Sequence, residues 1–141
     1  MNLETLIPQK EPFLFVDEII QLEPGVRALG KKELRDDEGY FKGHFPDKPV
    51  FPGVLMIEAA GQLANAVVRA LPEHKDSYLY YSKMSKVKFM KEAVPGDVLE
   101  LEVQVTDTFE ELVFCKVFVR KDSEEAFRAD VVFNIIRSSK R

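Results

Sequence analysis

The stretch Tyr40–Gln62, YFKGHFPDKPVFPGVLMIEAAGQ, decides the fold and the chemistry that we expect for this 141-residue chain. Within residues 43–52, three prolines each fix φ and remove a backbone N–H donor, so this segment is predicted to be a stiff loop. Pro52 suits the first position of a helix, and Gly53 lets another group approach the backbone closely. A helix is therefore predicted to begin at this Pro-Gly pair.

The helix that follows is predicted to cover residues 54–71 and to lie at the centre of the fold, because almost all of its residues are apolar or small. The exceptions are Glu58, Gln62, Asn65 and Arg69. Their spacing of four, three and four places them in one narrow stripe along a helix. By default such a stripe is solvated; if other elements wrap the helix, it faces a cleft, a cavity or an interface.

Two groups near the start of this helix suggest acid–base chemistry. Glu58 is the only acid in the helix and lies one to two turns from an end whose N–H groups carry a partial positive charge. His44 precedes it in a Gly-His-Phe-Pro turn, where a histidine is by default structural. Together, a histidine, an acid and an oxyanion-binding helix start can remove a proton beside a carbonyl. His74, in the polar segment 72–76, is expected to be an exposed residue without a catalytic role.

Residues 43–62, GHFPDKPVFPGVLMIEAAGQ, closely resemble the active-site region of the (3R)-3-hydroxyacyl-acyl-carrier-protein dehydratases. The resemblance extends to IPQKEPFLFVDEIIQLEPG at 7–25 and KVKFMKEAVPGDVLELEV at 86–103. It implies the α+β hot dog fold, in which a curved antiparallel sheet wraps one long central helix. It also implies a dimer formed by edge-to-edge pairing of two sheets, often assembled further into a hexamer.

The resemblance also implies roles for individual residues. His44 would take the C2 proton of a 3-hydroxyacyl thioester on acyl carrier protein, and Glu58 would hold or protonate the departing C3 hydroxyl. The N–H of Gly53 would bind the thioester oxygen, and Gln62 would either orient Glu58 or be a stripe residue without catalytic effect. Each site would combine His44 of one subunit with Glu58 of the other. No cofactor is needed, because elimination of water requires only proton transfers.

Four lysines after the helix are candidates for docking the acidic carrier protein. They are Lys83, Lys86, Lys88 and Lys91. The alternative is that they protect and solubilise an edge strand. The chain also departs from the family pattern near this cluster and in the opening loop. Gln9 and Lys10 replace a usual His-Arg pair, Gly61 stands where alanine is common, and Ser85 and Met90 replace an acid and an arginine.

The rest of the chain is predicted to be mostly strands within a single domain, 1–141. Turn signals such as Glu23-Pro24-Gly25 and Pro95-Gly96-Asp97 separate apolar or alternating runs. Strands are expected at 13–20, 26–34, 78–90, 98–106, 112–120 and 127–136. Strands, one helix, then four strands in succession is an α+β pattern, and an antiparallel sheet must cover the helix.

Composition narrows the functional classes. A net charge of −4 argues against nucleic acid or an anionic membrane as the main partner. The single Cys115 is expected to be a small buried hydrophobe in a reducing compartment. The chain has no metal-binding Cys/His spacing and no secretory or spanning segment, so a cytoplasmic protein without a metal is expected.

Two further functions stay open beside dehydration. A hot dog thioesterase would hydrolyse the same thioester with water activated by a carboxylate. A catalytically silent acyl-carrier-binding subunit is suggested by the altered loop residues.

Overall fold

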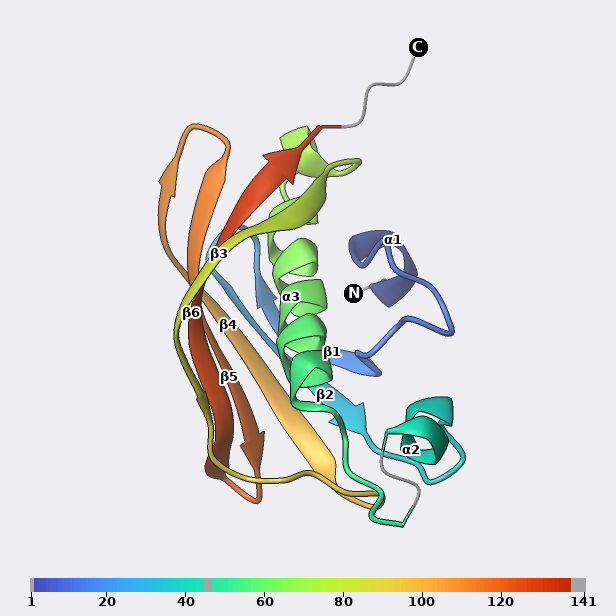
Figure 1. Ribbon diagram of the computed structural model, residues 1–141. Coiled ribbons are helices and arrows are strands. Elements are labelled where there is room, and N and C mark those ends of the chain that lie inside the picture. Colours follow the sequence, from blue (N-terminus) through green and yellow to red (C-terminus); the bar gives the residue numbers. More distant parts are fainter. Residues whose placement is uncertain (1, 45–46, 138–141) are drawn as a thin grey trace.

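The computed structural model describes residues 2–44 and 47–137 and contains a six-stranded antiparallel sheet (Figure 1). The strand order is β1-β2-β4-β5-β6-β3, and every neighbouring pair is antiparallel. The strands are β1 (Glu18–Glu23), β2 (Arg27–Glu33), β3 (Tyr78–Phe89), β4 (Val98–Phe109), β5 (Leu112–Lys121) and β6 (Glu124–Ile136).

One long helix, α3 (Gly53–Arg69), lies along one face of this curved sheet. On the other side of α3 lies the N-terminal segment with the short helix α1 (Leu3–Leu6), and α2 (Gly39–Gly43) lies beside its lower end in Figure 1. A 3-10 turn, η1 (Pro72–His74), follows α3 and leads into β3. The helix is thus covered on two sides, as its apolar sequence requires.

Buried apolar residues at alternate positions of β4, β5 and β6 build the sheet side of the core. In β4, Leu99, Leu101 and Val103 are fully buried, and in β6 Phe127 and Val131 are at most 1% exposed. Because side chains alternate across a strand, these residues all point to the face that carries α3. Five of the eleven buried residues of α3 are alanine or glycine, and such small residues let a helix lie close to a sheet. Among the described residues, no helix is long and apolar enough to cross a membrane.

The predicted elements after residue 53 are confirmed to within a few residues, whereas the first strand is not. It begins at Glu18 and not at residue 13, and residues 13–17 cross α3 as a loop. The predicted stiff loop is preceded by α2, which ends at Gly43 and was not predicted. Phe45 and Pro46 of the Gly-His-Phe-Pro turn lie outside the described residues.

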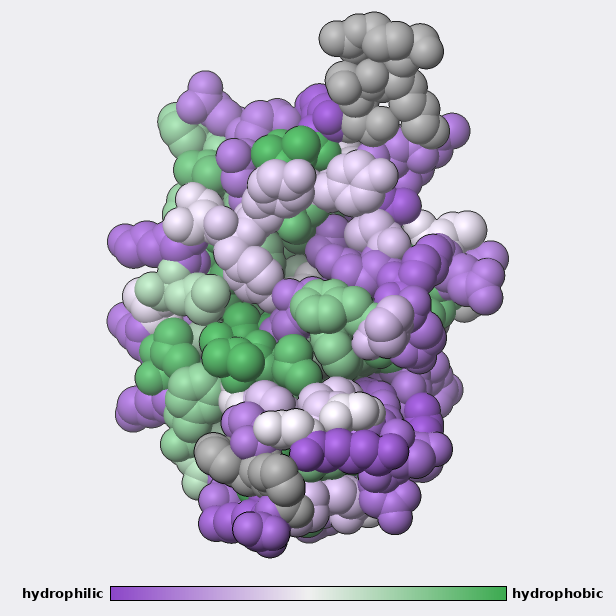
Figure 2. Space-filling view, turned by 45° about the vertical axis from the view of Figure 1, so that its right-hand side comes forward, coloured by the Kyte–Doolittle hydropathy of each residue, from purple (hydrophilic) through white to green (hydrophobic). Residues whose placement is uncertain are grey.

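The sheet edge at β3 carries many exposed apolar and aromatic side chains. Figure 2 shows a patch of hydrophobic side chains on one face of the molecule. The exposed side chains of β3 include Tyr80 at 61% exposure and Phe89 at 56%, together with Tyr78, Met84 and Val87. An edge strand with exposed apolar side chains can pair with another chain, although β3 also carries Lys83, Lys86 and Lys88 between them.

Candidate active site

Glu58 lies in the second turn of α3, partly buried between two hydrogen-bond donors. The amide Nε2 of Gln62 donates to Glu58 Oε2 at 3.0 Å, and the hydroxyl of Tyr81 donates toward Oε1 at 3.1 Å. Burial raises the pKa of the Glu58 carboxyl group, and the bonds from Gln62 and Tyr81 oppose that rise without cancelling it. The carboxyl group is therefore held in one place with an increased tendency to carry a proton.

Gln62 is fully buried, so the default expectation of a solvated stripe is wrong for this residue. Its Oε1 accepts the backbone N–H of Phe15 at 2.8 Å, and its Nε2 donates to the carbonyl of Phe13 at 2.8 Å. Since both ends are committed, the amide can present only N–H to Glu58. Gln62 thus orients Glu58 and fastens the loop 13–17 to α3.

The other stripe residues also anchor backbone. Asn65, only 3% exposed, accepts the N–H of Leu79 at the start of β3 and donates to the carbonyl of Gly61. Arg69 donates to the carbonyls of Ser77 and Thr5. The polar stripe of α3 is consequently a set of attachments for the segments that wrap the helix.

His44 caps the C-terminal end of α2 and is oriented by the loop that follows. Its backbone N–H donates to the carbonyl of Tyr40, and its ring Nδ1 lies 3.1 Å from the carbonyl oxygen of Val50. A carbonyl can only accept, so Nδ1 carries the proton and Nε2 is the basic nitrogen of the neutral ring. In this tautomer Nε2 is the ring nitrogen that can accept a proton.

A buried ion pair connects the start of α2 to the sheet. Lys32 on β2 is 1% exposed, and its Nζ lies 2.6 Å from Glu38 Oε2. Glu38 also accepts from the Tyr40 hydroxyl and from the N–H of Arg35. Burial raises the pKa of Glu38, but the bonds from Lys32, Tyr40 and Arg35 outweigh it and lower the pKa below its usual value. The segment that carries His44 is therefore tied to the sheet.

Gly53 begins α3, as predicted. A Cβ at this position would lie 2.6 Å from Cε1 of the Phe89 ring, so this glycine allows β3 to approach the start of the helix. Gly53 precedes Glu58 by five residues on the same helix, and its role in binding an oxyanion stays a prediction.

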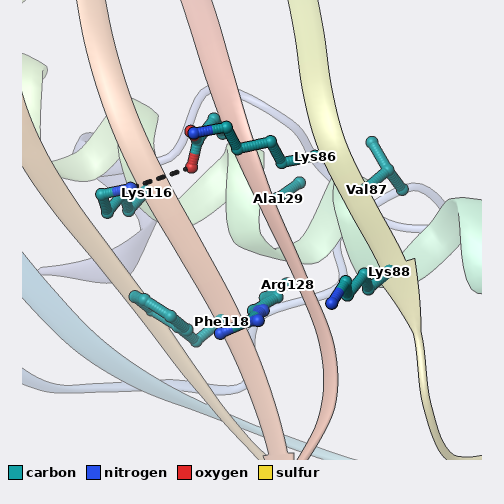
Figure 3. A pocket seen from close by; sticks show the side chains of 8 residues that line it. Lys86, Val87, Lys88, Lys116, Phe118, Arg128 and Ala129 are labelled. Carbon is teal, nitrogen blue, oxygen red and sulfur yellow. Dashed lines mark hydrogen bonds and ion pairs between the residues drawn. The ribbon is translucent and has the colours of Figure 1, made fainter.

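The candidate docking lysines lie in three places. Lys86 and Lys88 line a groove on the sheet face away from α3, together with Lys116 of β5 and Arg128 of β6 (Figure 3). Lys83 lines a neighbouring hollow that also contains Lys116. Lys91 lies apart in an ion pair with Glu124.

The second histidine differs from its prediction. His74 is 9% exposed, and its Nδ1 lies 3.2 Å from the Ser77 hydroxyl, so it is a buried structural residue and not a surface one. Cys115 is buried as predicted, and burial raises the pKa of its thiol to about 12.

The sequence reasoning missed Tyr81, which binds Glu58. A signal was present, because an isolated glycine inside a helix often has a packing reason, and Gly61 faces this tyrosine. The groove residues Lys116 and Arg128 were also missed, since only the sheet pairing brings them beside β3.

A curved antiparallel sheet around one central helix defines a hot dog-fold protein, here with a histidine before the helix and a carboxyl group inside it. Solved structures agree on the fold. The dehydratase heterocomplex ApeI:P from Xenorhabdus doucetiae matches with a TM-score of 0.79 and 12% identity over 99% of this chain and 93% of that one. A hypothetical thioesterase with coenzyme A from Streptococcus pneumoniae matches with a TM-score of 0.66 and 13% identity over 86% and 88%.

The sequence comparisons define the family more narrowly. A FabA-like domain model matches residues 7–130. The 3-hydroxyacyl-[acyl-carrier-protein] dehydratase FabZ of Clostridium novyi is 38% identical over 134 residues, which are 95% of this chain and 94% of that protein. The FabZ of Chloroflexus aggregans is 46% identical over 104 residues, 74% of this chain and 72% of that protein. The chain belongs to the FabA-like family, and its dehydratase relatives match it along most of its length.

Proposed function

We propose that this protein dehydrates (3R)-3-hydroxyacyl-acyl carrier protein to the trans-2-enoyl product in the biosynthesis of fatty acids or related lipids. The observation that carries the proposal is the environment of Glu58. Its carboxyl group is held by Gln62 and Tyr81, and burial raises its pKa, which suits a group that gives a proton to a leaving hydroxyl. The dehydratase relatives support the same reaction.

In this mechanism His44 Nε2 takes the proton from C2 of the substrate. The electron pair of that C–H bond forms the C2–C3 double bond while the C3–O bond breaks, and the oxygen leaves as water with a proton from Glu58. The N–H of Gly53 donates to the thioester oxygen, which gains negative charge as the C2 proton is removed. At the end His44 carries one proton more and Glu58 one fewer, and exchange with water resets both.

The reaction is tested with purified protein and a 3-hydroxyacyl carrier protein. We expect the trans-2-enoyl thioester and water. Release of free carrier thiol would instead identify a thioesterase, and binding without either product would identify a silent carrier-binding subunit. His44→Ala and Glu58→Gln should each lower turnover by about 10²–10⁴-fold, the usual contribution of one acid or base. Full activity in either variant would refute the assigned roles.

We also propose that the working unit is a homodimer, alone or within a trimer of dimers, in which β3 of one subunit pairs with β3 of the other. Support comes from the exposed apolar side chains on this edge, such as Tyr80 and Met84. In this arrangement His44 of one subunit serves Glu58 of its partner.

A mixing experiment tests the shared site. Chains carrying His44→Ala and chains carrying Glu58→Gln are each expected to have little activity alone. If sites are shared, randomly mixed dimers regain about a quarter of the wild-type sites, because each mixed dimer has one site with both lesions and one with neither. If His44 and Glu58 act within one chain, every site keeps one lesion and mixing restores nothing.

Carrier docking is proposed for the lysine cluster Lys83, Lys86, Lys88 and Lys91. The groove in Figure 3 supports a role for Lys86 and Lys88, since Lys116 and Arg128 add positive charge there and, among the described residues that line it, Asp130 is the one acid. Such a surface complements an acidic partner. We further propose that residues 1–141 form one domain of this kind and that it acts in the cytoplasm, where a single buried thiol stays reduced.

A further inference from the structure

The contact between Tyr81 and Glu58 involves two neighbouring acceptors and one proton. The Tyr81 hydroxyl lies 3.1 Å from Glu58 Oε1 and 3.2 Å from the backbone carbonyl oxygen of Ile57. A hydroxyl has a single proton to donate, so the two acceptors compete for it. An ionised carboxylate wins this competition, because hydrogen bonds to charged groups are the stronger ones.

The competition reverses when Glu58 is protonated. A neutral carboxyl group attracts the hydroxyl proton less, and the Tyr81 hydroxyl can then donate to the Ile57 carbonyl while its oxygen accepts from Glu58. Gln62 differs from Tyr81 in this respect, since its amide is fixed by Phe13 and Phe15 and can only donate. Oε2 of Glu58 thus faces the Gln62 amide, which can only donate. Oε1 faces the Tyr81 hydroxyl, which donates to the charged carboxylate and can accept from the neutral carboxyl group.

Gly61 provides the space for this contact. A Cβ at position 61 would overlap the Tyr81 hydroxyl oxygen and lie 2.9 Å from Cζ of the ring. Glycine in the interior of a helix is unfavourable relative to alanine. The helix therefore carries an unfavourable residue at a position where a side chain would collide with this tyrosine.

The position of the Tyr81 ring is fixed by its packing against β6. Tyr81 lies on β3 opposite Phe133 of β6, and the two rings are 5.2 Å apart. Burial, and then the charge of Glu58, raise the pKa of the Tyr81 hydroxyl, so it stays a protonated donor while Glu58 titrates.

We propose that Tyr81 is a positioning residue for Glu58, and that Gly61 is present because its missing side chain admits the tyrosine hydroxyl. This inference rests on the proposed dehydratase function for its effect on rate. Tyr81 holds Oε1 in the charged and the neutral state of Glu58, so proton transfer at this oxygen needs little movement of the carboxyl group.

The test compares the wild-type protein with Tyr81→Phe over a range of pH. Loss of a hydrogen bond to the charged form of Glu58 should lower turnover about tenfold, and should move the limb of the pH–rate profile that Glu58 controls upward by about one pH unit. Thr108→Val is the control for loss of a hydroxyl group, because Thr108 is exposed on β4, a strand that does not pair with β3. An unshifted limb in Tyr81→Phe overturns the proposal.

Gly61→Ala is the second variant. We expect it to reproduce the slower rate and the shifted limb of Tyr81→Phe, and to have a much smaller effect when Tyr81→Phe is already present. Equal fold-changes in both backgrounds would show that Gly61 and Tyr81 act independently and would refute the pairing.

A direct titration separates this inference from the proposed function. In protein labelled with ¹³C at the glutamate carboxyl carbon, the signal that disappears in Glu58→Gln belongs to Glu58. Its midpoint should rise in Tyr81→Phe whether or not the protein dehydrates the substrate. An inactive wild type would end the dehydratase proposal, and an unchanged midpoint would end the Tyr81 proposal.

Discussion

Replacing Gln62 with leucine tests the attachment between α3 and the loop 13–17. Leucine has a similar size but cannot bond the N–H of Phe15 or the carbonyl of Phe13, each 2.8 Å from the Gln62 amide. Phe15 is 4% exposed, so its N–H cannot reach water, and an unsatisfied buried donor costs about 1–3 kcal/mol. The carbonyl of half-exposed Phe13 can be hydrated, so its loss adds about 0.5–1.5 kcal/mol.

The free energy of unfolding should therefore fall by about 2–4 kcal/mol in Gln62→Leu. Urea denaturation at a fixed protomer concentration measures it, since dimer formation would otherwise change the apparent stability. Gln21→Leu, the same change on exposed β1, should stay within about 0.5 kcal/mol of wild type. A loss below 0.5 kcal/mol in Gln62→Leu would mean that these hydrogen bonds do not hold the loop.

Three further predictions concern charged groups. Because burial raises the pKa of Glu58, the contribution of this group to the stability of the fold is greatest below about pH 4.5, the unfolded value, and is lost as pH rises through the folded pKa. Glu58→Gln should therefore gain stability relative to wild type in urea unfolding as pH rises above about 4.5, and an equal gain in the exposed control Glu73→Gln would contradict this. Lys32→Met should destabilise by about 1–3 kcal/mol at pH 7, since it leaves partly buried Glu38 without its cation. Because the pKa of Glu38 is lowered in the folded protein, the stability that its charged form contributes is lost as pH falls below about 4.5. The destabilisation caused by Lys32→Met should therefore become smaller at low pH, and a destabilisation that does not change with pH would contradict the ion-pair explanation. Lys88→Glu should raise KM for the carrier-bound substrate and leave KM for a pantetheine thioester unchanged; equal effects of exposed Lys75→Glu would refute docking at the groove.

Much of the candidate site could be predicted from residues 40–62, because the patterns that indicate it involve residues close together in the sequence. A Pro-Gly pair before an apolar run marks a helix start wherever it occurs, and α3 begins at Gly53 as expected. The stripe with Glu58 and Gln62 follows from helical spacing alone. The contact between them spans four residues and needs no knowledge of the fold.

The predictions that were wrong concern residues whose structure depends on contacts with distant parts of the chain. Residues 13–17 have a strand-like composition but form a loop that follows α3. The side chain of Gln62, 47 residues away from Phe15 in the sequence, accepts the backbone N–H of Phe15 and holds the loop there. His74 sits in a polar segment and is nevertheless buried. Propensity describes a segment alone, and tertiary contacts overrode it at both places.

The sequence by itself therefore determined the α+β pattern, the central helix, and the histidine and acid as candidate partners, because these depend on residue order over short distances. Only the tertiary structure decided what surrounds Glu58. Tyr81 follows it by 23 residues on another element, and whether they meet depends on how β3 packs against α3. The same packing buries the carboxyl group and raises its pKa, and a linear pattern contains no measure of burial.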